Sequence, residues 1–351
     1  MARGTLARWL LVAALGLAIA AAAAWLGLRW LDERRMAEPI AGLEAPRTFV
    51  IAPGTPLGGV VRTLDEAGLL AHPQSFRRSA MRQGLAARLK AGEYEARPGA
   101  TPSDLLGMLA EGRVLLHSVT LVEGWTALQA LAAVQAHPAV TATLPAGDAQ
   151  ALAAAIGLDG RPAEGMLFPD TYLFQRGTAD AALLRQARQR LDAVLAEAWE
   201  ARQDDLPLKD AYEALILASI VEKETGAADE RPLIAGVFVN RLRLGMRLQT
   251  DPTVIYGLGA AFDGNLRRAD LLRDTPYNTY TRAGLPPTPI ALAGRAAIEA
   301  ALRPADTEAL YFVATGLGDG RHRFARTLAE HNANVSRYIL ALRGARGGGT
   351  Q

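Results

Sequence analysis

The sequence predicts an α+β protein with three parts: an N-terminal transmembrane helix, a small α+β subdomain and a larger mixed α+β domain. An apolar run at residues 9–28 contains no charged residue, which is typical of a membrane helix. Beyond it, short extended stretches alternate with apolar patterns of helical period. The 351 residues are enough for two domains that bury a sizeable core.

The apolar run at 9–28 can cross a hydrocarbon core of about 30 Å at a rise of about 1.5 Å per residue. We expect it to remain as a membrane anchor. The rival interpretation is a cleaved signal peptide with small-residue sites at 18–24, but signal sequences typically have a shorter apolar run of about 7–15 residues. Arginines flank both ends of the run, so the positive-inside rule does not orient it.

Residues 29–46 are charged and then contain Pro and Gly, so we expect a linker there. Residues 47–112 have the pattern of a small α+β unit, because apolar spacings of helical period are separated by turn residues. The expected elements are a strand at 48–51, helices at 57–64 and 76–89, an extended stretch at 92–94 and a helix at 102–110 that stops at Gly112.

Residues 113–343 are expected to form the larger domain. Thr126 and Gln129 have the spacing of a capping box, so a helix should begin there. Asp210 and Glu213 repeat that spacing and place the start of another helix. The other expected elements are a strand at 114–122, helices at 179–202 and 232–244, a stop at Gly245 and a flexible tail at 344–351.

Composition excludes several functions. The net charge is +2 with both signs mixed along the chain, so no nucleic-acid partner is expected. The absence of cysteine excludes disulfides and thiol catalysis. The five histidines lack the spacing of metal ligands, so we expect neither a metal nor another cofactor. Glycine clusters at 257–259 and 316–320 lack the context of nucleotide loops and are interpreted as turns.

Glu224 is the most informative single residue. Leu217, Ile220 and Val221 form an apolar helix stripe, and Glu224 continues it. Burial would raise the pKa of this carboxyl group and keep it protonated near neutral pH, as a general acid requires. The alternative is that Glu224 ends the helix at the solvent boundary, with Gly226 as a C-terminal cap.

The block around Glu224 resembles the MltG (YceG-like) family of endolytic murein transglycosylases. The resemblance covers most of the chain beyond residue 45 and is far more specific than a lone short motif. The segments that carry it are 218–225 (ASIVEKET), 240–242 (NRL), 246–257 (MRLQTDPTVIYG), 277–280 (YNTY), 284–290 (GLPPTPI) and 330–332 (EHN).

The resemblance implies a single-pass inner-membrane enzyme that acts on peptidoglycan glycan strands. Residues 1–8 would lie in the cytoplasm and the catalytic domain at 113–343 in the periplasm. It implies that 47–112 is a LysM-like subdomain; the alternative is a spacer that does not bind glycan. It favours Glu224 over Glu222 as the single general acid/base, and 1,6-anhydromuramoyl ends as the product. Peptidoglycan synthases, the penicillin-binding proteins, are further expected partners.

Asp251 leaves a second mechanism open, in which a hydrolytic muramidase uses Glu224 as the acid and Asp251 to activate water. Asp251 also precedes Pro252 as a helix N-cap would, which favours a supporting role. A third possibility is a noncatalytic glycan-binding scaffold. The residues expected to bind substrate or support the site are Glu222, Gln249, Thr250, Asp251, Tyr256, Tyr277, Asn278, Thr279 and Tyr280.

Overall fold

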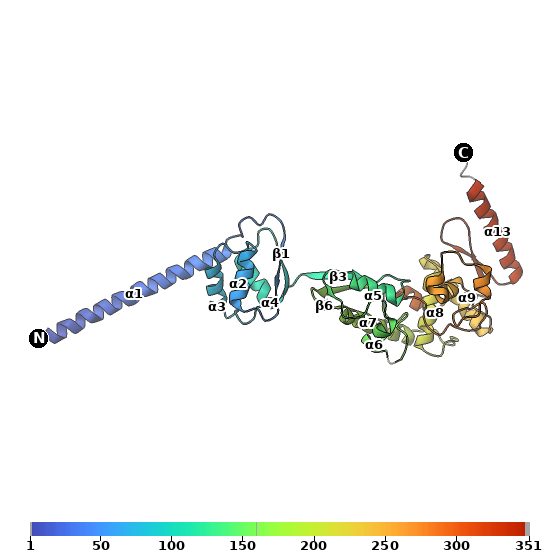
Figure 1. Ribbon diagram of the computed structural model, residues 1–351, viewed down its shortest axis with the longest axis horizontal. Helices are drawn as coiled ribbons and strands as arrows, with labels where there is room; N and C mark the ends of the chain where they lie inside the picture. The colour runs from blue at the N-terminus through green and yellow to red at the C-terminus, as the bar shows by residue number, and fades with distance from the viewer. Residues whose placement is uncertain (1, 159, 348–351) are drawn as a thin grey trace. The chain divides into compact units, whose positions relative to one another are not determined.

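The computed structural model describes residues 2–158 and 160–347 (Figure 1). The chain divides into two compact units, Met1–His117 and Ser118–Gln351. This division falls a few residues after the expected boundary at 112/113. Leu115 donates its backbone N–H to the carbonyl oxygen of Glu93 at 2.6 Å, and the His117 ring contacts the Glu93 carboxylate. These contacts attach residues 113–117 to the first unit.

Helix α1 (Ala2–Ala37) contains the apolar run expected at 9–28 and extends well beyond it. Within the part of the chain that the structure describes, it is the one helix long and apolar enough to cross a membrane, over Arg8–Ala37. The linker expected at 29–46 is therefore helical as far as Ala37, and that expectation was wrong for its first half.

A buried acidic residue explains why α1 continues. Asp32 is fully buried, and its carboxylate accepts hydrogen bonds from Arg78 at 2.7 and 2.9 Å and from Arg82 at 2.7 Å. Met36, one turn further on, packs into the core of the first unit. A buried charge requires such partners, so the end of α1 is held against α3.

The first unit contains one two-stranded antiparallel sheet and three short helices beside it (Figure 1). Phe49 lies opposite Tyr94 in the sheet, and their rings stack with centroids 5.6 Å apart. Helix α3 ends at Arg82 rather than near residue 89, because Gly84 takes a left-handed turn with φ of 67°. The elements are β1 (Arg47–Ile51), α2 (Leu57–Glu66), α3 (Pro73–Arg82), β2 (Gly92–Ala96) and α4 (Pro102–Glu111).

The second unit is mainly helical, with three two-stranded sheets, β3–β5, β4–β6 and β7–β8. Its strands are β3 (Leu116–Thr120), whose first residues belong to the first unit, β4 (Val140–Thr141), β5 (Thr171–Gln175), β6 (Thr178–Ala179), β7 (Tyr311–Ala314) and β8 (His322–Ala325). Its helices are α5 (Ala127–Gln135), α6 (Ala149–Ala155), α7 (Asp180–Glu200), α8 (Ala211–Glu224), η1 (Ala228–Glu230), α9 (Arg231–Arg243), α10 (Asp251–Leu258), η2 (Gly259–Ala261), α11 (Arg268–Leu272), α12 (Arg295–Leu302) and α13 (Leu328–Gly347). The mixed α+β class is confirmed.

Helix α8 is the centre of this unit. Every residue from Ala214 to Val221 is buried, because α7, α9, α10 and α12 all pack against the helix. The apolar stripe expected on one face is therefore part of a helix that is apolar all round. Glu224 is the last residue of this buried helix, so its position is fixed by the main core.

Two of the expected N-terminal caps are present. Thr126 and Gln129 form the reciprocal capping box of α5. The Asp210 carboxylate accepts the Glu213 N–H at 2.9 Å and starts α8.

Two other expectations, a turn at 257–259 and a flexible tail at 344–351, were wrong in part. Gly257 lies inside α10, where an added Cβ would be 3.1 Å from Tyr277 Cβ. Helix α13 occupies residues 344–347 of the expected flexible tail, and 348–351 lie outside the described residues.

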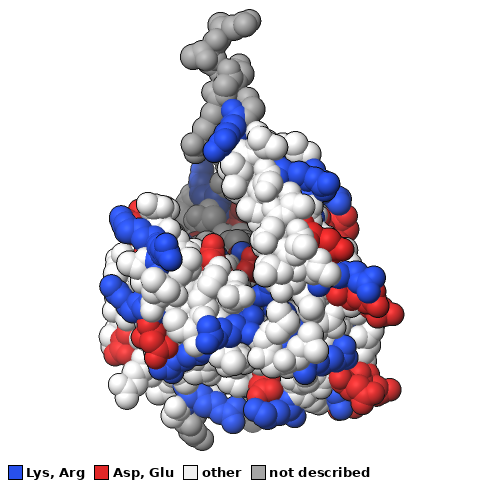
Figure 2. Space-filling model, turned by 90° about the vertical axis from the view of Figure 1, so that its right-hand side faces the viewer, with Lys and Arg blue, Asp and Glu red and all other residues white. Residues whose placement is uncertain are grey.

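On the face drawn in Figure 2, Lys and Arg side chains are interspersed with Asp and Glu. No single-sign surface of the kind that nucleic acid requires dominates this face.

We predict that Asp32→Ala lowers the free energy of unfolding of the first unit by about 2–3 kcal/mol, because charge-assisted hydrogen bonds are lost from a buried carboxylate. Hydrogen exchange of the full chain in detergent should show faster exchange of the amides at 32–37. Glu33→Gln is the matched control, since Glu33 is exposed and pairs only within α1. Unchanged protection in Asp32→Ala would contradict the role of Asp32.

Candidate active site

Glu224 lies at the C-terminal end of α8, where the chain leaves the core. Thr225 ends the helix in an extended conformation, and its hydroxyl accepts the Ala227 N–H at 2.9 Å. The cap expected at Gly226 is thus supplied by Thr225. Glu224 itself is half-buried beneath Thr250, whose hydroxyl donates a hydrogen bond to its Oε1 atom.

Glu224 borders a cavity of about 410 Å³. The other lining residues are Arg241, Leu248, Gln249, Asp251, Tyr280, Tyr311, Phe312, Val313, Leu328 and His331. Four residues expected at the site thus meet here: Glu224, Gln249, Asp251 and Tyr280. Gln249 has φ of 50°, a left-handed conformation that a residue with a side chain rarely adopts. Such backbone strain is concentrated at functional sites.

Burial raises the pKa of Glu224 to about 6, mainly by removing water from the carboxylate. The negative charge of Asp251 raises it further, while the Thr250 hydrogen bond, His322 and Arg241 lower it. With a pKa of about 6 the acid form is the larger fraction below pH 6, and a minor but accessible fraction of about one tenth remains at pH 7. This carboxyl group can both donate and accept a proton.

Asp251 does not cap α10 as expected. It is the first residue of the helix, and its Oδ1 atom accepts a hydrogen bond from the Tyr280 hydroxyl at 2.6 Å. No side-chain cap is found at the preceding Thr250, because that hydroxyl is directed to Glu224. The Asp251 side chain is exposed at the cavity, unlike that of Glu224.

Three buried threonines hold the wall behind Glu224. The Thr250 N–H donates to Thr279 Oγ1 at 3.1 Å, and the hydroxyls of Thr279 and Thr253 are 2.9 Å apart. The Thr253 hydroxyl also donates to the Thr250 carbonyl oxygen at 2.8 Å. Thr250 and Thr279 therefore orient the acid from inside the protein instead of lining the cavity.

Asn278, Tyr277 and Tyr256 do not line this cavity. Asn278 is buried, and its amide donates to the carbonyls of Asp270, Leu271 and Arg273 at 2.7–3.2 Å. These bonds fix the loop that carries Thr279 and Tyr280. The Tyr277 hydroxyl is 2.9 Å from Thr288 Oγ1, and the rings of Tyr277 and Tyr256 meet edge to face.

Glu222 occupies a different side of α8. Its Oε2 atom accepts the Gly294 N–H at 2.9 Å, and its Oε1 atom lies 3.5 Å from Arg231 Nη2. An added Cβ on Gly294 would be 1.9 Å from a carboxylate oxygen of Glu123, so this close approach requires glycine. Glu222 is thus paired with a cation and a backbone donor, which suits a structural role.

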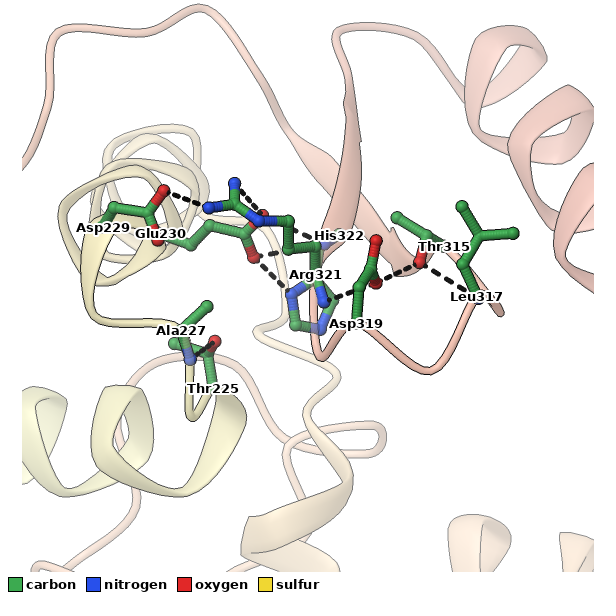
Figure 3. Close-up of polar contacts among 9 residues, drawn as sticks. All are labelled: Thr225, Ala227, Asp229, Glu230, Thr315, Leu317, Asp319, Arg321 and His322. Atoms are coloured by element: carbon green, nitrogen blue, oxygen red, sulfur yellow. Dashed lines mark hydrogen bonds and ion pairs between the residues drawn. The ribbon is translucent and has the colours of Figure 1, made fainter.

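The loop after Glu224 is tied to the β7–β8 hairpin (Figure 3). The buried Glu230 carboxylate accepts the backbone N–H of His322 at 3.1 Å, and its Oε2 atom lies 2.8 Å from His322 Nδ1. Arg321 donates to Asp229 at 2.6 Å beside it. These bonds restrain the segment that follows the acid and keep His322 near Glu224.

A family model described as the YceG-like family matches residues 49–337. The chain belongs to the YceG-like family. The resemblance noted in the sequence is thereby confirmed. The crystal structure of a YceG-like protein from Listeria monocytogenes superposes with a TM-score of 0.54 at 29% identity, over 83% of this chain and 99% of that one.

Two curated relatives carry the name endolytic murein transglycosylase. The protein of Bacillus subtilis strain 168 is 40% identical over 178 residues, which cover 51% of this chain and 48% of the relative. The protein of Streptococcus pneumoniae strain D39 is 28% identical over 333 residues, which cover 83% of this chain and 58% of the relative. The chain thus spans about half to three-fifths of the length of these relatives.

Among the cavity residues that sequence reasoning missed, three have polar side chains: Arg241, Tyr311 and His331. Buried Arg241 donates to the carbonyl oxygens of Leu310 and Leu248 at 2.6 and 2.7 Å and lies over the Tyr311 ring. Tyr311 in turn stacks on His331 at 5.2 Å. Arg241 and His331 lie within the family segments at 240–242 and 330–332, which was the available signal, but nothing in the sequence joined them to Glu224.

Glu164 was also missed as a perturbed acid. Burial raises its pKa to about 6, although it accepts hydrogen bonds from the N–H groups of Ala127 and Gly165 and from the Tyr256 hydroxyl. It borders another cavity, with Tyr256, and not the one that holds Glu224. A raised pKa alone therefore does not identify the acid of this site.

We predict that Asp251→Asn lowers the pKa of Glu224, because the charge of Asp251 now raises it. The pH at which a Glu224-dependent rate falls off on the alkaline side should move to lower pH. A shift of about half a unit would reduce the rate at pH 7 by about threefold. Carbon-detected NMR titration of the Glu224 carboxyl group gives the shift directly.

Asp251→Glu, which keeps the charge, is the control for this titration. An unchanged or higher pKa in Asp251→Asn would show that the charge of Asp251 does not act on Glu224. The asparagine carbonyl can still accept the Tyr280 hydroxyl, so the contact itself is not removed.

Proposed function

We propose that the chain is a peptidoglycan lytic transglycosylase that cuts nascent glycan strands internally and thereby limits their length. The observation that carries the proposal is the half-buried Glu224, with a pKa raised to about 6, beside an open cavity. The names of the two curated relatives support the same chemistry. The cut bond would join N-acetylmuramic acid to N-acetylglucosamine.

In this reaction one carboxyl group serves both steps. Protonated Glu224 donates its proton to the glycosidic oxygen as the bond from that oxygen to muramoyl C1 breaks. The muramoyl C6 hydroxyl then attacks C1, and its proton passes to the Glu224 carboxylate. The product has a 1,6-anhydro ring, no water is consumed, and Glu224 returns to its starting state. Since the nucleophile belongs to the substrate, proximity replaces a second catalytic group.

The cavity supplies groups for holding sugars around Glu224. The exposed Gln249 side chain offers an amide, and Tyr280 and Asp251 together offer a hydroxyl and a carboxylate oxygen. The ring of His331 has a buried Nδ1 atom for which the described residues provide no partner. Burial and Arg241 lower the pKa of His331, so a neutral imidazole is available to hydrogen-bond a hydroxyl or an acetamido group.

A hydrolytic muramidase is the second candidate, because Asp251 lines the same cavity as Glu224. In that mechanism water, activated by Asp251, would attack C1 and leave a reducing end. Against it, Asp251 is held by the Tyr280 hydroxyl at 2.6 Å. A noncatalytic scaffold is less well supported, because a binding surface has no need of a desolvated acid.

We also propose that α1 anchors the protein in the inner membrane with the second unit in the periplasm, where nascent glycan lies. Penicillin-binding synthases are the expected protein partners there. The LysM-like character of residues 47–112, and glycan binding by them, belong to the same proposal. The small sheet with helices packed beside it is compatible with such a module.

Glu224→Gln should reduce strand cleavage by about 10²–10⁴ or more, because one residue carries both proton transfers. The glutamine oxygen can still accept the Thr250 hydrogen bond, so the fold should remain intact. The raised pKa of Glu224 means that its ionised form disfavours folding at pH values above about 6. The melting temperature at pH 7 should therefore be unchanged or higher in this variant.

Glu222→Gln is the matched control on the same helix. It removes the pairing with Arg231 but also a carboxylate whose pKa burial raises, so the melting temperature should change little, and the variant should retain more activity than Glu224→Gln. If the activities of the two variants are reversed, the assignment of the acid to Glu224 is wrong.

The product separates the two candidate mechanisms. Digestion of purified strands in heavy-oxygen water should give anhydromuramoyl ends without label, lighter by one water than reducing ends. Mass spectrometry of the fragments measures both properties. Labelled reducing ends that disappear in Asp251→Asn would establish the muramidase mechanism instead.

A further inference from the structure

A second cavity lies along α10, next to the one that holds Glu224, and has a volume of about 500 Å³. Its lining residues are Gly124, Thr126, Gln129, Lys223, Pro252, Ile255, Tyr256, Gly259 and Ile290. We propose that this cavity binds the peptide stem of a muramoyl residue, with the Lys223 ammonium group on a stem carboxylate. The inference rests on the proposed function and names a part of its substrate.

The two cavities share the same two helices. Lys223 and Glu224 are consecutive on α8, and one residue turns a helix by about 100°, so their side chains diverge to different cavities. On α10, Asp251 borders the cavity of Glu224, whereas Pro252, Ile255 and Tyr256 border the second one. A substituent on a muramoyl residue at Glu224 therefore has a neighbouring site within the same unit.

Lys223 is a cation without an acidic partner among the described residues. Its side chain is exposed, and its Nζ atom donates only to the carbonyl oxygen of Gly124, at 3.2 Å. Of the other lysines, Lys209, just before α8, pairs with Glu213 at 2.9 Å, and Lys90 in the first unit donates to the Glu111 carbonyl oxygen at 2.9 Å. The charge of Lys223 is thus available to an incoming anion.

The wall beside Lys223 is built by main-chain pairing. The Gly124 N–H donates to the carbonyl oxygen of Leu292 at 2.8 Å, and the Leu292 N–H donates to the carbonyl oxygen of Trp125 at 2.7 Å. These bonds hold the Gly124 carbonyl where the ammonium group reaches it. Gly124, together with Thr126, therefore forms one side of the cavity.

The lining selects a peptide rather than more sugar. N-acetylated sugars whose lactyl group is joined to a peptide carry no charge, so they offer nothing to Lys223. Stem peptides combine carboxylates with small apolar side chains. Pro252, Ile255 and Ile290 provide an apolar wall for the side chains, and Thr126 and Gln129 provide a hydroxyl and an amide for the peptide backbone.

The decisive experiment compares strands that carry stems with the same strands after an amidase has removed the stems and the lactyl carboxylates so exposed have been converted to neutral amides. Wild-type protein should cleave stem-bearing strands with a kcat/KM about tenfold higher, as one charge-assisted contact allows. Lys223→Met keeps the aliphatic stem of the lysine and should remove most of this preference, without lowering cleavage of bare strands. Lys223→Arg should keep part of the preference for stem-bearing strands. The control variant Lys209→Met should keep all of this preference.

Binding of a soluble stem peptide to the full chain in detergent, measured by calorimetry, gives a readout independent of cleavage. Lys223→Met should weaken this binding about tenfold, with an unchanged melting curve. Equal cleavage of both strand types by the wild type, with no binding of the peptide, would overturn the inference and leave the proposed function intact. Peptide binding without cleavage of either strand would support the cavity and overturn the proposed function.

Discussion

The desolvation of Glu224 is the constraint on which the site depends. A carboxylate removed from water disfavours its charged form, and α8 brings Glu224 to the edge of the core with one neutral donor, the Thr250 hydroxyl. A cation in direct contact would hold the group ionised and unable to donate a proton. The buried ladder of Thr250, Thr253 and Thr279 keeps that neutral donor in place without adding charge.

The two glutamates of α8 show how the same residue type acquires two roles. They are about 200° apart around the helix, so they meet different neighbours. Burial raises the pKa of both carboxyl groups, but Glu222 is occupied by the Gly294 N–H and Arg231, which oppose that rise, whereas Glu224 faces a hydroxyl and an open cavity. Access to the cavity, and not the direction of the pKa shift, distinguishes the residue that can act on a substrate.

Local features were predictable from sequence, and features made by tertiary contact were not. The Thr126–Gln129 capping box needs only its own four residues, so its prediction was confirmed. The extension of α1 depends on Asp32 meeting arginines almost fifty residues away, which no local pattern reveals. Glu224 stood out because a carboxylate followed apolar neighbours. Arg241 and His331 come to the same cavity from α9 and α13 and gave no comparable signal.

The pKa of Glu224 is set first by burial, which raises it, and by the Thr250 hydrogen bond, which lowers it, and is then adjusted by charges of both signs. Burial and Asp251 act in one direction, while Arg241 and His322 act in the other. Arg241 is itself held by backbone carbonyls and Tyr311, so its charge stays at a fixed distance from the cavity. The Glu230 carboxylate, 2.8 Å from His322 Nδ1, likewise holds the His322 ring in place. A substrate that excludes water would strengthen every one of these charge interactions, and the balance is kept because charges of both signs were placed around the acid in advance.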